Sequence, residues 1–105
     1  MLNRMNTGVL GDSGDTRVVE LTGIANLDSI TTVEVDIWAP GVDKTATACT
    51  VAVSADRTIN APVGTFLAGA KAKEGTWSLE IVLDRGLATE LTFPAERPAA
   101  FPVRS

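Results

Sequence analysis

The sequence predicts an all-β protein built as a sandwich of two sheets, and three observations support this. Residues 75–94 (GTWSLEIVLDRGLATELTFP) alternate apolar and polar positions on both sides of a short turn, which is typical of a half-buried β-hairpin. Thr and Val are abundant and Tyr and His are absent, a bias that suits strands. Turn signals recur about every ten residues, a spacing typical of β-sandwiches and not of helical bundles.

The alternation divides the chain into about seven short strands. They are expected at residues 16–21, 30–38, 45–53, 57–61, 76–83, 88–93 and 100–104. Residues 84–86 are expected to form the hairpin turn, and Trp77 is expected in the core. Residues 65–72 fit either a short helix capped by Thr65 or an irregular crossover, because Gly69 weakens the helical period.

One predicted strand carries the single cysteine. Residues 45–53 are expected to point Cys49, Val51 and Val53 inward, so that Cys49 is a small buried core residue. A reactive thiol is the alternative, but the chain has no His to activate it. One cysteine also excludes a disulfide within the chain.

The chain is predicted to consist of an arm and one domain. Residues 1–14 are rich in Asn, Gly and Ser, and we expect a flexible arm that becomes ordered where it touches a neighbouring subunit. Residues 15–105 are expected to form the sandwich, which has an ordinary size for one domain. Removing the arm should therefore leave the domain folded.

Charge and hydropathy exclude several classes of partner. The net charge of −4 and the scattered Lys and Arg argue against nucleic acid or an anionic membrane, which both attract clustered basic residues. The chain shows neither the apolar run of a signal peptide nor the roughly 20 apolar residues of a membrane span. We therefore expect a soluble protein that is made and assembled in a cytoplasm.

The residue types that catalysis needs are missing. The absence of His excludes Ser-His-Asp and Cys-His arrangements, and one Cys cannot hold zinc. Asp12 and Asp15 match no calcium loop and are interpreted as a solvated turn. Glu34 and Asp36 share one face of a strand, which we expect to be a solvent face and not a catalytic pair. The sequence thus predicts a protein that is not an enzyme and needs no metal or cofactor.

Contacts with other proteins are predicted at Trp38, Pro40, Phe101 and Arg104. Trp38 falls on the outward face of its strand, beside Pro40. It either tucks under the next loop or the arm, or it contacts a partner, since Trp is enriched in interface hot spots. A proline bracket runs from Phe93-Pro94 to Phe101-Pro102 and includes the start of the last strand, which carries Phe101 and Arg104. Because Pro cannot donate to a ladder, this strand is predicted to be an edge to which neighbouring subunits add.

Several short motifs follow one another along the chain: Gly14-Asp15-Thr16, Leu21-Thr22-Gly23, Trp38-Ala39-Pro40-Gly41, Gly75-Thr76-Trp77-Ser78-Leu79-Glu80, Leu91-Thr92-Phe93-Pro94 and Pro102-Val103-Arg104. In this order they resemble small immunoglobulin-like domains of tailed-phage virions. The similarity is to the N-terminal domain of baseplate upper proteins and to short minor tail proteins of phages that infect actinobacteria. The resemblance covers residues 14–104.

This resemblance implies an immunoglobulin-like antiparallel β-sandwich and a structural role in the virion. It favours a minor tail or baseplate component that docks in multiple copies on tail-tube, baseplate or capsid subunits. Assembly in the host bacterial cytoplasm agrees with a single unpaired Cys. A capsid (head) decoration protein is the alternative with the same fold. A carbohydrate-binding or adhesion module is the alternative from another class, although it would need more exposed aromatic residues than Trp38.

Overall fold

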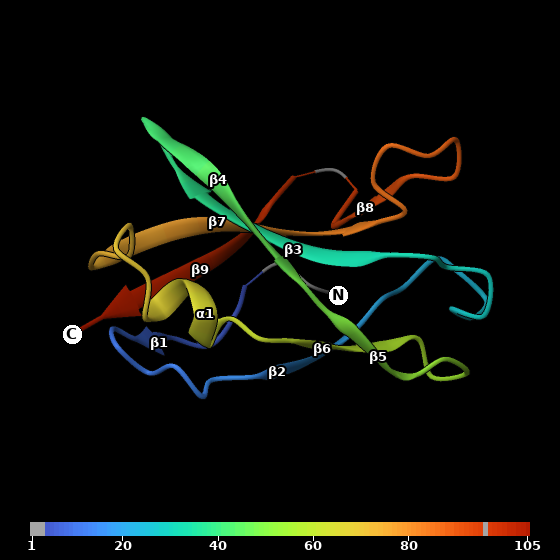
Figure 1. Ribbon diagram of the computed structural model, residues 1–105, viewed down its shortest axis with the longest axis horizontal. Helices are drawn as coiled ribbons and strands as arrows, with labels where there is room; N and C mark the ends of the chain where they lie inside the picture. Colours follow the sequence, from blue (N-terminus) through green and yellow to red (C-terminus); the bar gives the residue numbers. More distant parts are fainter. Residues whose placement is uncertain (1–3, 96) are drawn as a thin grey trace.

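The computed structural model describes residues 4–95 and 97–105, which contain nine strands and one short helix (Figure 1). In chain order the elements are β1 (Gly8–Val9), β2 (Arg17–Glu20), β3 (Val33–Ala39), β4 (Val42–Ala48), β5 (Thr50–Val53), β6 (Thr58–Ala61), α1 (Gly64–Leu67), β7 (Gly75–Leu83), β8 (Leu91–Phe93) and β9 (Ala99–Arg104). The strands form two sheets that enclose one core, as the alternation of the sequence predicts.

The larger sheet, sheet A, has the strand order β1-β9-β7-β3-β4, and β8 also pairs with β7. The long strand β7 organises this sheet. Along one side it pairs with β3, from Leu83 opposite Val33 to Ser78 opposite Trp38. Its other side is shared, because β9 pairs with the first half of β7 and β8 with the last three residues.

The smaller sheet, sheet B, has the order β2-β6-β5 and is antiparallel throughout. The chain passes from sheet A to sheet B between β4 and β5, at Cys49, and Figure 1 shows these two strands as one continuous diagonal. Strands β9, β7 and β3 stand where strands G, F and C stand in an immunoglobulin domain, and β2, β6 and β5 where B, E and D stand. The protein is therefore a β-sandwich in which these strands follow the order found in immunoglobulin domains.

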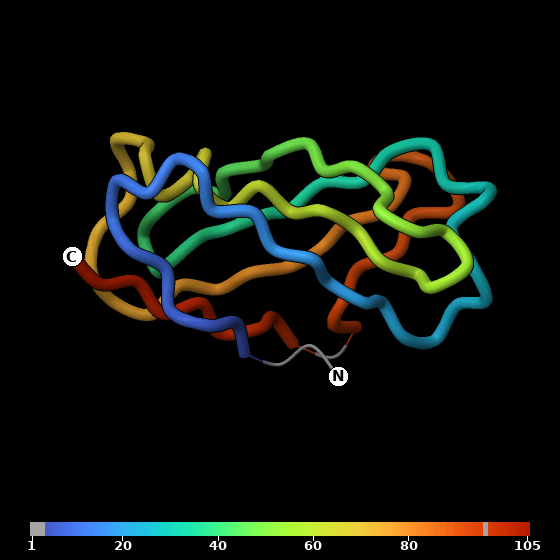
Figure 2. The backbone as a smooth tube through the Cα atoms, turned by 90° about the horizontal axis from the view of Figure 1, so that it is seen from below, coloured from blue at the N-terminus to red at the C-terminus, as the bar shows by residue number. Residues whose placement is uncertain are grey.

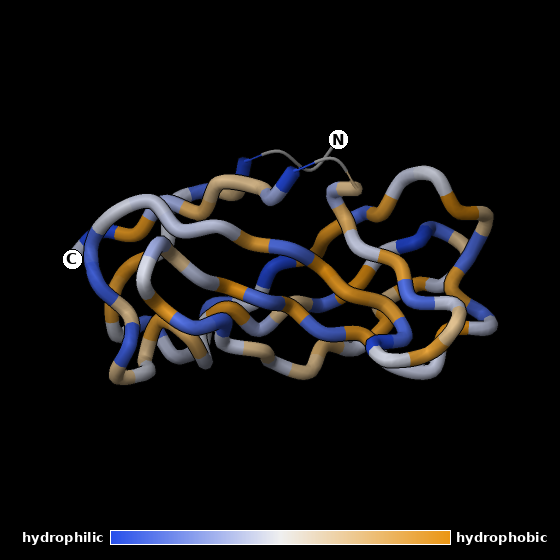
Figure 3. Tube along the Cα trace, turned by 90° about the horizontal axis from the view of Figure 1, so that it is seen from above, coloured by the Kyte–Doolittle hydropathy of each residue, from blue (hydrophilic) through white to orange (hydrophobic). Residues whose placement is uncertain are grey.

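The core forms where the inward faces of the two sheets meet. Trp77, Leu79, Ile81 and Leu83 on β7 are all buried, which confirms the predicted face of this strand. The alternation of apolar and polar residues along the strands can be followed in Figure 3. The ring of Phe66 on α1 meets the Trp77 ring edge to face, with 4.8 Å between centroids.

The prediction of one inward-facing strand over residues 45–53 is wrong. The chain divides there into β4 and β5, and these lie on different sheets. Val51 and Val53 are 40% and 48% exposed, because β5 is an edge strand and an irregularity between them shifts the register. Cys49, which is half-buried, lies at the crossing instead of deep in the core.

The N-terminal residues also differ from the predicted flexible arm. Met5 is buried, and its N–H donates to the carbonyl oxygen of Ala100 at 2.8 Å. Gly8 lies so close to Phe101 that an added Cβ would come within 2.9 Å of the ring. Figure 2 shows the blue N-terminal stretch running beside the red C-terminal strand. From residue 4 onward the predicted arm is therefore part of the sandwich.

That same stretch corrects the prediction of a C-terminal edge. Strand β9 lies between β7 and β1, and Gly8 and Val9 pair in parallel with Val103 and Arg104. Pro102 has no N–H to donate, and β9 receives the N-terminal residues through carbonyl groups on either side of it: Met5 donates to Ala100 and Leu10 donates to Arg104, both at 2.8 Å. A proline bracket was thus insufficient evidence for a free edge.

Two local boundaries differ from the predictions. The helix α1 begins after Val63, which makes no side-chain capping hydrogen bond, so Thr65 is not the N-cap. In the predicted hairpin, β7 and β8 do pair, but the connection spans residues 84–90 and β8 begins only at Leu91. Thr89 lies in this loop, where its hydroxyl donates to Asp84 at 2.8 Å.

Candidate interaction surface

The outer face of sheet A gathers the charged side chains of β3. Glu34 and Asp36 point to this face, as their spacing predicts. The expectation that both are solvated is wrong for Asp36, which is only 1% exposed. A buried carboxylate is costly unless it is paired and hydrogen-bonded, so Asp36 needs a cation beside it.

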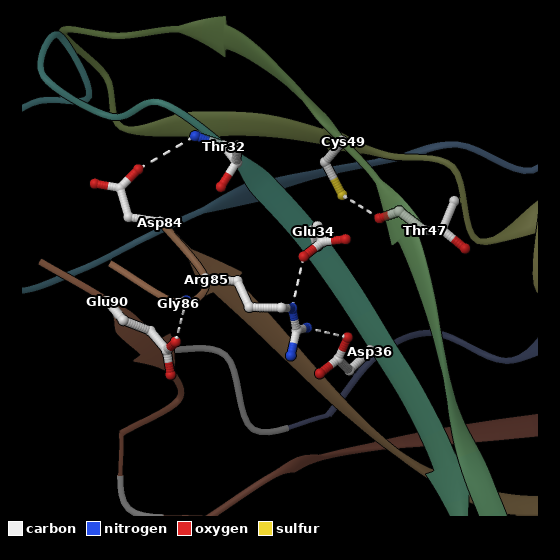
Figure 4. Close-up of polar contacts among 9 residues, drawn as sticks. All are labelled: Thr32, Glu34, Asp36, Thr47, Cys49, Asp84, Arg85, Gly86 and Glu90. Carbon is white, nitrogen blue, oxygen red and sulfur yellow. Dashed lines mark hydrogen bonds and ion pairs between the residues drawn. The ribbon is translucent and has the colours of Figure 1, made fainter. Parts of the chain in front are cut away.

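Arg85 supplies that cation from the loop that follows β7 (Figure 4). Its Nε donates to Glu34 at 2.6 Å and its Nη2 donates to Asp36 at 2.5 Å. The hydrogen bond that it donates to Asp36, and then the one to Glu34, raise the pKa of the Arg85 guanidinium above its ordinary value. Arg85 therefore fixes the loop to the middle of the sheet and keeps Asp36 compensated.

Asp84 holds the same loop from its other side. The backbone at Asp84 has a φ of +52°, which Asp tolerates better than most residues. Its carboxylate accepts the N–H groups of Thr31 (2.7 Å) and Thr32 (3.2 Å) as well as the Thr89 hydroxyl. These hydrogen bonds, with that of Thr31 the largest, lower the pKa of Asp84. The adjacent residues Asp84 and Arg85 thus join this loop to the residues just before β3 and to the first half of β3.

Trp38 lies at the other end of the same face. The Nζ atom of Lys44 lies 4.4 Å from the centre of the Trp38 ring and 3.6 Å from a Glu80 carboxylate oxygen. The Trp38 side chain is half-buried. One ring face is thus covered by a cation from β4, an arrangement that stabilises modestly at an exposed site.

The four residues predicted as interface contacts do not form one surface. Trp38 and Pro40 belong to the end of β3 and the turn that follows it, and Arg104 ends β9. Pro40 and Arg104 are exposed. Phe101 is fully buried and lies in the core against α1, so its ring is not available to a partner.

The sequence prediction missed the features of β4 that make it an open edge. Ala46 and Ala48 on this strand are exposed, and in the described part of the chain β4 pairs only with β3. The signal was present in the sequence as the run TATACTVAV, residues 45–53, which holds no charge and no Pro. That run was interpreted as one half-buried strand, because the change of sheet at Cys49 leaves no mark on the alternation.

Two shallow hollows lie at opposite sides of the sandwich. One, of about 420 Å³, follows β2 beside Arg4 and Met5. The other, of about 570 Å³, lies between β3 and the crossing at Cys49. Burial, and then the charge of Glu34, raise the pKa of the Cys49 thiol to about 11. The thiol is therefore protonated at neutral pH and a poor nucleophile.

Among residues 4–95 and 97–105, no group of three or more His, Cys, Asp or Glu side chains is placed to hold a metal ion. No helix within these ranges has the length and apolar character to cross a membrane. A scan against protein-family models and searches of curated proteins and of solved structures gave no match to the chain. The resemblance to phage domains thus stays a prediction.

Proposed function

We propose that the protein is a non-enzymatic assembly module of a tailed-phage virion, and that it docks in multiple copies as a minor tail or baseplate component. The observation that carries this proposal is the open edge β4. A sandwich that leaves a seven-residue edge strand exposed offers other subunits a template for pairing. The immunoglobulin-like topology supports the proposal because it is the fold that the resemblance implies.

The charged residues of the outer face support an assembly role better than a catalytic one. Asp36 is compensated by Arg85 at 2.5 Å, and Glu80 by Lys44 at 3.6 Å. Groups that are already paired in this way stabilise the loop and the sheet, whereas a general acid or base needs a carboxylate within reach of a substrate proton. The Lys44 cation on the Trp38 ring also competes with any sugar that would stack on that face.

The presence and position of the protein on the phage particle test this proposal. An antibody raised against the purified protein is applied to purified phage particles from the source of the gene, and bound gold is located by electron microscopy. Labelling at the tail or baseplate is the expected result. Labelling spread over the head would assign the protein to capsid decoration instead. Particles without label and without the protein's peptides in mass spectrometry would overturn the virion role.

A further inference from the structure

Strand β4 directs a row of backbone groups to the outside. The N–H of Cys49 donates to the carbonyl oxygen of Val33 at 2.8 Å. Hydrogen-bonded pairs alternate along an antiparallel ladder, so Thr47 and Thr45 also direct their N–H and C=O groups toward β3. Ala46 and Ala48, which lie between them, direct theirs away from the sheet.

The features that usually protect an edge strand are absent from this part of β4. Protection comes from a charge, a proline or a bulge. Residues 45–48 are Thr and Ala, and their ladder with β3 is regular; its one irregularity lies between Ile37 and Ala39, near the turn. The edge strand β2, on the opposite side of the sandwich, differs because its inward-pointing Arg17 guanidinium reaches the carbonyl oxygen of Asn6 at 2.8 Å and closes that side.

We propose that β4 pairs antiparallel with β4 of a second copy about a twofold axis at Ala46, so that the two A sheets become one. The outward hydrogen-bonding groups and the need to keep each side chain on its own face are both compatible with this register. Ala46 then lies opposite Ala46 of the second copy, and Lys44 lies opposite Ala48 of the second copy.

The charges on the outer face are complementary in this register. Ala48 pairs directly with Glu34 within one molecule. Only the small side chain of Ala48 therefore separates Lys44 of each copy from Glu34 of the other copy, while the Lys44 Nζ atom stays 3.6 Å from Glu80 of its own sheet. The two Lys44 residues lie at opposite ends of the joint ladder, so like charges are kept apart. A second copy of this chain thus fits the edge without a new unpaired charge.

The geometry of the crossing excludes an extended ladder. A register centred on Ala48 would bring in β5, but the chain leaves sheet A at Cys49, and β5 has its own irregularity after Val51. A ladder limited to β4 is short, and small interfaces are typical of weak and reversible association. A twofold contact of this kind therefore joins copies reversibly in pairs. This inference names one contact by which the proposed assembly module associates, and it rests on that proposed function.

Disulfide trapping tests the register in purified protein, which separates a failure of strand pairing from a failure of the virion role. In a Cys49→Ala background that circular dichroism shows to be folded, Ala46→Cys is compared with Ala48→Cys. Directly opposed hydrogen-bonded residues have Cα atoms about 5.5 Å apart, within the range of a disulfide. The two Ala48 positions would be about 13 Å apart along the ladder.

We expect a covalent dimer of the Ala46→Cys variant and a monomer of the Ala48→Cys variant on non-reducing gels. Equal trapping of both variants, trapping at position 48 alone, or no trapping would overturn the proposed pairing.

Sedimentation of variants without new thiols provides a second measurement of dimerisation. Ala46→Lys places two like charges face to face and should weaken dimerisation at least tenfold. Leu87→Lys adds the same charge in an exposed loop and should leave dimerisation unchanged; equal effects of both lysines would contradict the proposal.

Discussion

The two long sides of the sandwich end in different ways. On the β2 side, Arg17 points inward, holds Asp15 through two hydrogen bonds of 2.6 and 2.7 Å, and reaches the backbone of the N-terminal residues. On the β4 side, small side chains leave the outward backbone groups free. One side is therefore closed by a charge that faces inward, and the other is left open by the lack of any such residue.

This difference shows that edge protection is a property of single side chains and not of the fold. In the described part of the chain, β2 and β4 each pair with one strand, β6 and β3 respectively. Their side chains alone make one unsuitable and the other suitable for pairing with another strand. Variants that remove contacts on the closed side, or contacts that hold the outer face of sheet A, test this difference.

Deleting residues 1–10 should have the largest effect, because it removes β1 and the buried Met5 from the closed side. Burial of one such side chain and the lost hydrogen bonds correspond to a loss of about 3 kcal/mol or more. Urea denaturation followed by fluorescence measures the change. An unchanged urea midpoint would instead support the sequence prediction that the N-terminal residues form an arm independent of the domain. Leu87→Ser, in an exposed loop, is the control with little expected change.

Arg85→Met should lower the free energy of unfolding by about 2 kcal/mol, since it leaves Asp36 buried without its cation. The value is below that of a fully buried pair because the Arg85 side chain is 42% exposed and partly screened by water. Adding Asp36→Asn should recover part of the loss. If the double variant is as unstable as the sum of both single variants, the two residues are not coupled.

Arg17→Met should cost about 1–2 kcal/mol through the lost bonds to Asp15 and to the carbonyl oxygen of Asn6. Lys44→Met is the matched control. It removes a pair in which Lys44 is 52% exposed, and it should change stability by less than about 1 kcal/mol. Thermal unfolding compares the two. Equal losses of stability in the two variants would mean that Arg17 contributes no more to the β2 side than Lys44 contributes to the β4 side.

The pH dependence of stability should reflect Asp84. Its pKa is lower in the folded protein than in the unfolded chain, where it is about 3.9. The unfolded state therefore binds the proton more readily, and the contribution of Asp84 is complete above pH 4 and is lost as the pH falls through the folded pKa. In the Asp84→Asn variant, the melting temperature should therefore fall less steeply between pH 6 and pH 2 than it does in the unsubstituted protein. An unaltered acid slope would contradict this role.

The sequence was sufficient for the fold class because alternation records which side chains face the core. The inward residues of β7 were assigned correctly for this reason, whereas Phe101, predicted as an interface contact, is buried. Alternation does not record which sheet a strand belongs to. The change of sheet at Cys49 was therefore missed, and with it the two free edges on either side of the crossing.

The candidate surface was less predictable because it depends on contacts between residues far apart in sequence. Arg85 and Asp36 are 49 positions apart in the sequence, and no pattern near either residue predicts that they form an ion pair. Trp38 was singled out correctly as an outward residue, but its neighbour Lys44 comes from the next strand. The packing of the N-terminal residues on β9 was likewise invisible, since Met5 and Gly8 show no strand period.

Amide hydrogen exchange at two protein concentrations tests the central claim most directly, because it compares both edges in one sample. The N–H of Leu21 donates to the carbonyl oxygen of Arg57, so the alternating amides of Val18 and Glu20 on β2 point outward. We predict that exchange at Ala46 and Ala48 slows as the concentration rises, while Val18 and Glu20 keep their rates. Rates at Ala46 and Ala48 that do not depend on concentration would contradict the account.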